Sequence, residues 1–140
     1  MITAIAIDDE PLAIQVIKEY CGKIDFVDLK ATFTRAGKAL EFISENKVDL
    51  LFLDIDMPLI SGIDFYKRVP QTTVVIFTTA YSQYAVDSYN LNAIDYLLKP
   101  FDFSRFERAM EKAKDHFQLQ NFKKEVENDY LSIKIGRAHV

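Results

Sequence analysis

Four aspartates in two closely spaced pairs are the residues of this 140-residue chain best suited to chemistry. Asp8 and Asp9 follow one apolar run, and Asp54 and Asp56 follow another. Carboxylates that lie close together repel one another, so they need either raised pKa values or a bound cation. Oxygen-only ligands at a partly open site favour Mg²⁺, which keeps waters and phosphate oxygens in its coordination shell. The pattern therefore indicates chemistry that depends on magnesium.

Two further residues, Thr79 and Lys99, also follow apolar runs. They would add one hydroxyl donor and one positive charge to the carboxylates. This combination suits a phosphoryl group better than a carbonyl substrate. An aspartate can itself attack phosphorus and form an acyl phosphate. The side chains together predict phosphoryl chemistry.

These residues need a scaffold, and five apolar runs that recur at about the spacing of one βα unit predict it. Several runs are nearly continuous in β-branched or bulky residues, which is typical of strands buried on both faces of a parallel sheet. The second run alternates more and is expected at an edge. The runs cover residues 2–7, 27–33, 48–53, 73–78 and 93–98.

Helical patterns fill the gaps between the runs. Pro11 suits the first position of a helix, Thr34 can cap a second, and Asp102 can cap the last. Shorter helices are expected over residues 62–69 and 81–91. This alternation predicts an α/β fold, flavodoxin-like and doubly wound, with five parallel strands in the order 2-1-3-4-5 and helices on both faces. An order that begins 3-2-1 is the alternative, but the first turn lacks the expected glycines.

The predicted strand order places the chemistry at one edge of the sheet. Open α/β sheets bind ligands at the carboxyl ends of their strands, where the strand order reverses. In the order 2-1-3-4-5 this position lies between the first and third strands. Asp8, Asp9 and Asp54 should therefore converge there, with Thr79 and Lys99 along one side.

Composition excludes several other classes of protein. Seventeen basic and 21 acidic residues give a net charge of −4, which argues against nucleic-acid binding by this domain itself. A single cysteine, Cys21, excludes an internal disulfide and a cysteine-clustered metal site. The opening residues do not read as a signal peptide, and no apolar run is long enough to span a membrane. We expect a cytoplasmic protein with no membrane partner.

Four motifs in this order resemble the response regulator receiver domains of bacterial two-component signalling. They are IDDE at 7–10, LFLDIDMPLISG at 51–62, FTTA at 77–80 and DYLLKPF at 95–101. Residues 79–101 further resemble receivers attached to LytTR-type DNA-binding domains. The segment DYLSIKI at 129–135 resembles the opening strand of such a domain. The resemblance predicts a receiver (phosphoacceptor) domain over 1–120, then a linker and possible first strand of a truncated LytTR-type domain over 121–140.

By position, the resemblance implies a role for each site residue. Asp54 would accept the phosphoryl group, Asp9 would ligate Mg²⁺, and Asp8 would do so directly or through water. Asp56 stands where the family uses a backbone carbonyl as a metal ligand. We also expect its side chain to tune hydrolysis of the phosphoaspartate. Thr79 would hydrogen-bond a phosphoryl oxygen.

The remaining positions of the motifs concern the switch. Lys99 would pair with the phosphoryl group, and the Lys99–Pro100 peptide bond is a candidate for the cis form. Tyr96 matches the switch aromatic of the family, although a half-buried strand tyrosine would read the same way.

The implied function is phosphorelay signal transduction. A sensor histidine kinase would donate the phosphoryl group, and the changed surface would control an attached output in transcription. The resemblance implies a homodimer on phosphorylation and DNA contact only through a missing C-terminal domain. It implies no enzyme beyond self-phosphorylation and self-dephosphorylation.

Two alternatives stay open from the residues alone. LFLDIDM also resembles the start of haloacid-dehalogenase-like phosphatases, with Asp54 as nucleophile and Asp56 as acid/base. Those enzymes carry the motif on the first strand and add a cap domain, whereas here it falls on the third. The other alternative is a receiver-like binding module that works without phosphorylation, against which the intact acidic set argues. Asp8 and Asp9 could also simply cap the helix at Pro11.

Overall fold

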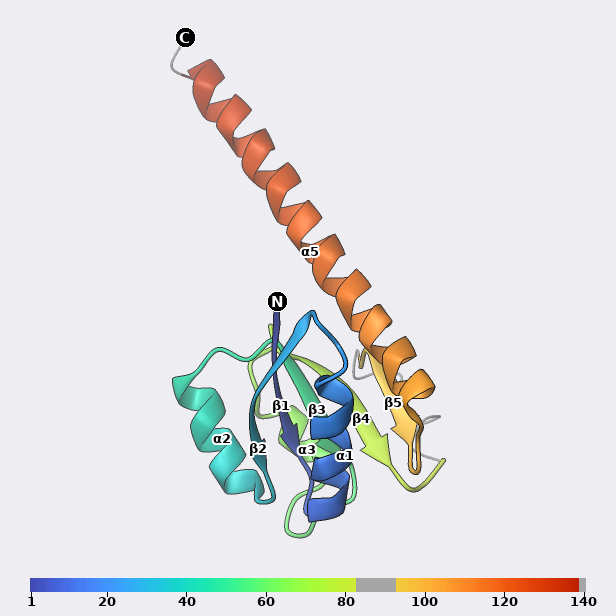
Figure 1. Cartoon of the computed structure of the whole chain (residues 1–140). Helices are drawn as coiled ribbons and strands as arrows, with labels where there is room; N and C mark the ends of the chain where they lie inside the picture. The colour runs from blue at the N-terminus through green and yellow to red at the C-terminus, as the bar shows by residue number, and fades with distance from the viewer. Residues whose placement is uncertain (83–92, 139–140) are drawn as a thin grey trace.

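The five predicted strands form one parallel sheet in the computed structural model, which describes residues 1–82 and 93–138. The strand order is β2-β1-β3-β4-β5, as predicted (Figure 1). Each neighbouring pair is parallel, and β1 pairs with both β2 and β3. The strands are β1 (Ile2–Ile7), β2 (Val27–Phe33), β3 (Leu50–Asp54), β4 (Val74–Thr79) and β5 (Asp95–Leu98).

The burial of the strands explains their sequence patterns. Every residue of β3 and β4 is buried, so both faces of these strands are covered. That is why their sequences are almost continuously apolar. β2 lies at an edge and is mostly half-buried, which confirms the expectation from its alternating sequence.

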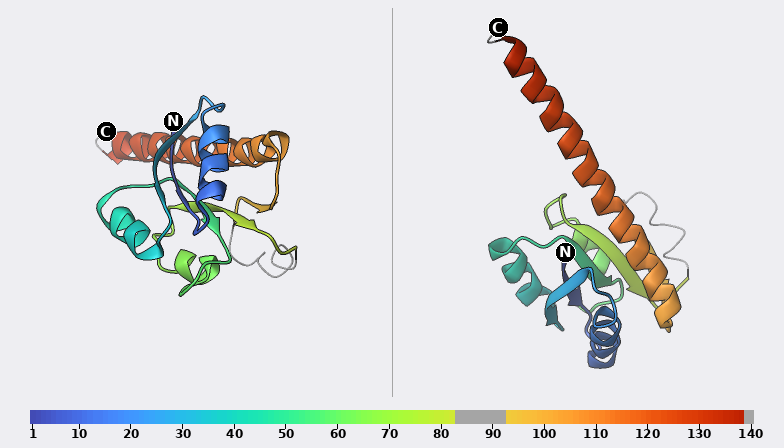
Figure 2. Two further views of the ribbon diagram at one scale, coloured as in Figure 1. Left: turned by 60° about the horizontal axis from the view of Figure 1, so that its bottom comes forward. Right: turned by 45° about the horizontal axis from the view of Figure 1, so that its top comes forward.

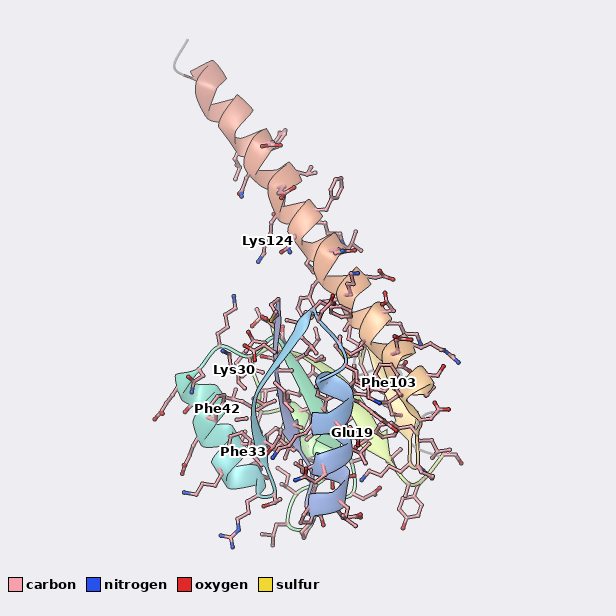
Figure 3. The ribbon with its side chains drawn as sticks, in the orientation of Figure 1. Glu19, Lys30, Phe33, Phe42, Phe103 and Lys124 are labelled. Carbon is pink, nitrogen blue, oxygen red and sulfur yellow. The ribbon has the colours of Figure 1, made fainter. Side chains whose placement is uncertain are left out.

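Helices cover both faces of the sheet (Figure 2). One face packs against α1 (Pro11–Cys21) and the first turns of α5 (Phe103–Ala138), through a core that includes Ile17, Phe52 and Phe106. The other face packs against α2 (Ala36–Glu45) and α3 (Gly62–Tyr66). Figure 3 shows this packing at one edge, where Phe33 of β2 and Phe42 of α2 meet with ring centroids 5.5 Å apart.

Three details of the predicted helices need correction or lie out of reach. Thr34 does not cap α2, because the helix begins after Arg35 and no side chain bonds its first amides. α3 ends at Tyr66 rather than at residue 69, and the amides of Arg68 and Val69 instead bond the carbonyls three residues earlier. The helix predicted over 81–91 lies largely outside the described residues. Asp102 does cap α5, because its Oδ1 accepts a hydrogen bond from the Arg105 amide at 2.8 Å.

The strand predicted near the end of the chain is wrong for this structure. Residues 130–135 are helical and belong to α5, which continues to Ala138 and leaves the sheet behind (Figure 1). A strand needs a neighbour to pair with, and a helix satisfies its backbone hydrogen bonds internally. Farther along α5, apolar side chains such as Leu119 and Phe122 are more than half exposed. The domain boundary near residue 120 stays a prediction.

None of the helices in the described ranges has the length and apolar character to cross a membrane.

Candidate functional site

Three carboxylates meet at the carboxyl edge of the sheet. Asp8 follows β1 and Asp54 ends β3, and the pairing of Ile7 with Leu53 brings the two strand ends side by side. Asp8 is 4% exposed and Asp54 is 2% exposed. One oxygen from each of Asp8, Asp9 and Asp54 lies within 4.8 Å of the others. The strand order predicted this convergence, and the structure brings the three residues together.

Asp8 and Asp9 do not cap the first helix. Oδ1 of Asp8 accepts a hydrogen bond from the Glu10 amide at 3.0 Å, which lies before the helix. Glu10 is the residue that flanks α1, and no side chain bonds the first amides of that helix. The simple capping interpretation of the two aspartates is therefore wrong.

Lys99 is the cation of this site. Its Nζ lies 2.8 Å from Oδ2 of Asp8 and 3.5 Å from Oδ1 of Asp54. Its main chain is fixed by a 2.7 Å hydrogen bond from its amide to the carbonyl of Thr79, and the Lys99–Pro100 peptide bond is cis. Burial alone would lower the pKa of Lys99, but the hydrogen bond to Asp8 and the nearby negative charges outweigh it and raise the pKa. The lysine therefore stays charged.

Asp54 is an unusual carboxyl group in this setting. Burial, and then the negative charge of Asp8, raise its pKa to about 7, against the lowering influence of Lys99 and of the Asp56 amide. Without a further cation, Asp54 is therefore only partly ionised near neutral pH. Additional positive charge at this point would favour the ionised, nucleophilic form of Asp54.

One atom of the cluster tests whether a divalent ion fits. Oδ1 of Asp9 is buried and accepts a hydrogen bond from no residue within 1–82 and 93–138. A buried oxygen without a partner is costly, and a bound cation is one way to satisfy it. The ligand atoms that Asp8, Asp9 and Asp54 offer are all hard carboxylate oxygens, and such a set fits Mg²⁺.

Asp56 and Thr79 contact each other, which the sequence did not predict. Oγ1 of Thr79 donates a hydrogen bond to Oδ2 of Asp56 at 3.0 Å, and the amide of Tyr81 donates to Oγ1 at 3.0 Å. The amide of Asp56 donates to Oδ1 of Asp54 at 3.2 Å. Thr79 ends β4 and is 1% exposed, so its hydroxyl needs a partner within the protein. The only sequence signal for the contact was the position of both residues at neighbouring strand ends.

Tyr96 packs against β4, the strand that ends in Thr79. Its ring stacks on Phe77 of β4, with centroids 5.4 Å apart and planes 17° from parallel. Tyr66 of α3 meets the same phenylalanine edge-on at 5.9 Å. Tyr96 is half-buried and belongs to the core on the α2 and α3 face. Its ring thus contacts the strand that carries Thr79.

Gly62 lies closer to Asp54 than the sequence indicated. The segment after β3 folds back so that the Gly62 amide donates to the carbonyl of Ile55 at 2.9 Å. A Cβ atom at Gly62 would lie 2.2 Å from the backbone oxygen of Asp54. The position therefore requires glycine, because any side chain would strike the backbone of the candidate nucleophile.

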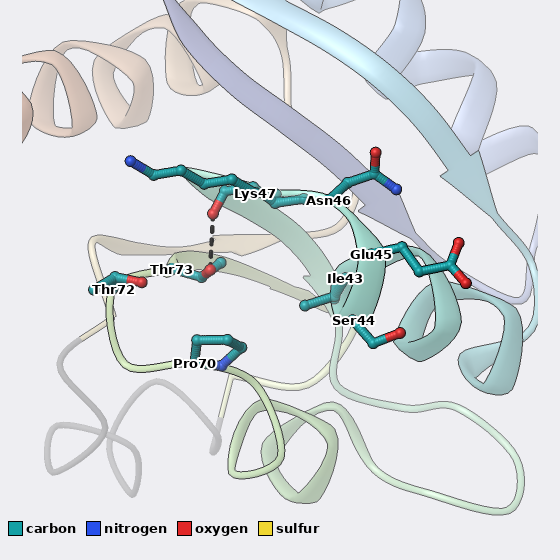
Figure 4. A pocket seen from close by; sticks show the side chains of 9 residues that line it. Ile43, Ser44, Glu45, Asn46, Lys47, Pro70, Thr72 and Thr73 are labelled. Atoms are coloured by element: carbon teal, nitrogen blue, oxygen red, sulfur yellow. Dashed lines mark hydrogen bonds between the residues drawn. The ribbon is translucent and has the colours of Figure 1, made fainter.

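A separate pocket of about 270 Å³ lies at the other edge of the sheet (Figure 4). It is formed by the end of α2 and the segments that lead into β3 and β4. Among the residues that line it, Oγ1 of Thr73 donates a 2.7 Å hydrogen bond to the carbonyl of Val48. Open α/β sheets bind ligands at the opposite, carboxyl edge. None of the site residues that the sequence predicts lines this pocket.

Comparison with known proteins gives a consistent result. Residues 4–111 match the family model described as the response regulator receiver domain. An uncharacterized response regulatory protein of Vibrio vulnificus is 38% identical over 124 residues, which cover 85% of this chain and 51% of the relative. The sensory transduction protein LytT of Bacillus anthracis is 32% identical over 123 residues, or 86% of this chain and 50% of LytT. The chain spans about half the length of these relatives.

Solved structures share the fold. The response regulatory domain of protein mrkE from Klebsiella pneumoniae superposes with a TM-score of 0.77 and 28% identity, covering 84% of this chain and 99% of that domain. The response regulator protein TrrA from Thermotoga maritima, solved in complex with Mg²⁺ and BeF, has a TM-score of 0.69 and 28% identity, covering 81% and 99%. These likenesses confirm the flavodoxin-like sheet.

Proposed function

Because this chain belongs to the response regulator receiver family, we propose that it accepts a phosphoryl group on Asp54 and relays the change to an attached output. The observation that carries the proposal is the cluster at the end of β1 and β3. There the carboxylates of Asp8, Asp9 and Asp54 each place an oxygen within 4.8 Å of the others. The Lys99 ammonium lies 2.8 Å from Asp8 and 3.5 Å from Asp54. We infer that the phosphoryl donor is a phosphohistidine of a sensor kinase.

The residues of the chain divide the work of the transfer. An oxygen of Asp54 forms a bond to phosphorus while the bond from phosphorus to the donor nitrogen breaks, and the nitrogen keeps that electron pair. The Asp56 amide and Lys99 both approach Oδ1 of Asp54, at 3.2 and 3.5 Å, and so orient the carboxylate. Positioning of this kind is the main protein contribution to phosphoryl transfer.

Magnesium and Lys99 would balance the charge. Mg²⁺ would be held by Asp8, Asp9, Asp54 and the backbone carbonyl of Asp56, and when bound it supplies positive charge to the phosphoryl oxygens. Lys99 is held by Asp8 and would pair with a phosphoryl oxygen on Asp54. A charge-assisted contact of this kind is stronger than one between neutral groups.

Thr79 and Tyr96 would report the change. A phosphoryl oxygen on Asp54 offers the Thr79 hydroxyl a new acceptor, and a shift of Thr79 would alter the packing of β4 against Tyr96. The protein would then move between two arrangements whose populations depend on the charge at Asp54.

We further propose that the complete protein is a transcription regulator. The match with LytT covers 50% of that relative, and the output would be a LytTR-type DNA-binding domain. On this proposal the described domain works in the cytoplasm, does not grip DNA itself, and forms a homodimer on phosphorylation. It turns over no separate substrate and only phosphorylates and dephosphorylates itself.

The test uses acetyl phosphate as a small phosphodonor. Incubation with acetyl phosphate and Mg²⁺ should add one phosphoryl group, measured as intact mass, and Asp54→Asn should abolish the addition. Asp64→Asn is the matched control, because Asp64 is an exposed carboxylate on α3 that pairs with Lys67 at 3.7 Å. An unmodified wild-type protein, or an equally modified Asp54→Asn variant, would contradict the proposal.

A further inference from the structure

The hydroxyl proton of Thr79 is already committed in this structure. Oγ1 donates to the carboxylate of Asp56 at 3.0 Å, while the carbonyl of Tyr81 lies at 3.5 Å, the outer limit for a hydrogen bond. A hydroxyl has only one proton to donate. Thr79 is 1% exposed, so bulk water does not compete for it. The hydroxyl cannot donate to a phosphoryl oxygen on Asp54 until it leaves Asp56.

Asp56 contacts both Thr79 and Asp54. Its side chain accepts from Thr79, and its amide donates to Oδ1 of Asp54 at 3.2 Å. A carboxylate acceptor makes a hydrogen bond roughly twice as strong as a neutral acceptor does. A phosphoryl oxygen is also anionic. Two anionic acceptors therefore compete for the Thr79 hydroxyl. The strength of its hydrogen bond to Asp56 decides how readily Thr79 turns to the phosphoryl group.

We propose that the carboxylate of Asp56 is a latch that holds Thr79 in the unphosphorylated arrangement. This inference rests on the proposed function, since the competing acceptor is a phosphoryl group on Asp54. Asp56 is then a positioning residue that acts through Thr79, in addition to the role proposed for its backbone carbonyl. A weaker latch moves the population toward the arrangement that phosphorylation favours.

The substitution Asp56→Asn tests the latch with little change of shape. Asparagine keeps the backbone and an acceptor oxygen but removes the charge. The probe is beryllofluoride with Mg²⁺, and its dissociation constant is measured by NMR titration. We expect Asp56→Asn to bind the probe about tenfold more tightly than the wild type, from the difference between charged and neutral hydrogen bonds. Asp64→Asn removes one exposed charge from α3 and should bind as the wild type does.

A double-mutant cycle separates the latch from simple repulsion between charges. In a Thr79→Val background there is no hydroxyl to hold, so Asp56→Asn should no longer tighten binding. An equal gain in that background would overturn the latch, because it would show that Asp56 acts on the probe by charge alone. Equal affinities of wild type and Asp56→Asn would also overturn it.

A second readout needs no probe in the site. The amide of Tyr81 donates to Oγ1 of Thr79 at 3.0 Å. Release of Thr79 from Asp56 should loosen this bond, so the Tyr81 amide should exchange its hydrogen faster in Asp56→Asn than in wild type or Asp64→Asn. Unchanged exchange would refute the latch. A wild type that binds no beryllofluoride would instead refute the proposed function, and the exchange rates would still decide whether Asp56 holds Thr79.

Discussion

The substitution Gly62→Ala should damage both the fold and the site. A Cβ at this position would lie 2.2 Å from the oxygen of Asp54, 2.9 Å from its carbonyl carbon and 2.9 Å from Cα of Ile55. All three are backbone atoms, so no side-chain rotation can relieve the contact. The backbone around Asp54 would have to move by roughly 1 Å, and this is overpacking of a well-filled interior.

The size of the effect follows from that displacement. Overpacking costs about 1–3 kcal/mol and occasionally more, and backbone contacts this short belong at the upper end, near 3 kcal/mol. For a domain of this size, that loss corresponds to a fall in Tm of about 12 °C. A displacement of about 1 Å at a reacting group can slow the chemistry roughly 100-fold. Phosphorylation of the folded variant should therefore be slower by about this factor.

Chemical denaturation and the rate of phosphorylation by acetyl phosphate measure the two effects. Gly37→Ala is the matched control, because a Cβ there meets nothing within 4 Å and the residue lies in α2. Alanine is favoured over glycine in a helix, so this variant should be about 0.5 kcal/mol more stable than the wild type. If Gly62→Ala had the stability and the phosphorylation rate of the wild type, the described approach of Gly62 to Asp54 would be wrong.

Two further substitutions probe charged groups. Burial alone would raise the pKa of Asp95, but hydrogen bonds from Arg105 and Lys112 outweigh it and lower the pKa below its ordinary value of 3.8. A lowered pKa stabilises the fold above pH 3.8, and this effect is lost as the pH falls further. Asp95→Asn should therefore lower the free energy of unfolding by about 2 kcal/mol at pH 7 and by progressively less toward pH 2, measured by denaturation at each pH. A loss of stability that does not change with pH would contradict this. Lys99→Met should slow phosphorylation by acetyl phosphate by roughly 100-fold, because the cation beside Asp8 is lost; a wild-type rate would exclude a role for the ammonium group.

The sheet was predictable because its determinants are local. Each strand is a short apolar run, and acidic or polar residues mark its carboxyl end. Asp8 and Asp54 could be placed together once the strand order was set, because the ends of neighbouring parallel strands share one edge. Lys99 followed from the same reasoning at the end of β5.

Other features depend on contacts that the sequence pattern does not encode. The bond between Thr79 and Asp56 depends on the conformations of two side chains, and the approach of Gly62 depends on the return of a loop. The strand expected over 130–135 failed for a different reason. An alternating sequence predicts a strand only where another strand can pair with it, and α5 satisfies its own backbone instead.

The central claim is that Asp54, among four neighbouring aspartates, takes the phosphoryl group. Borohydride reduces an acyl phosphate to an alcohol and so converts a phosphorylated aspartate into homoserine, which tandem mass spectrometry locates in the sequence. After treatment with acetyl phosphate and Mg²⁺, we expect homoserine at position 54 alone. Homoserine at position 8, 9 or 56 instead, or at none of the four, would contradict the account.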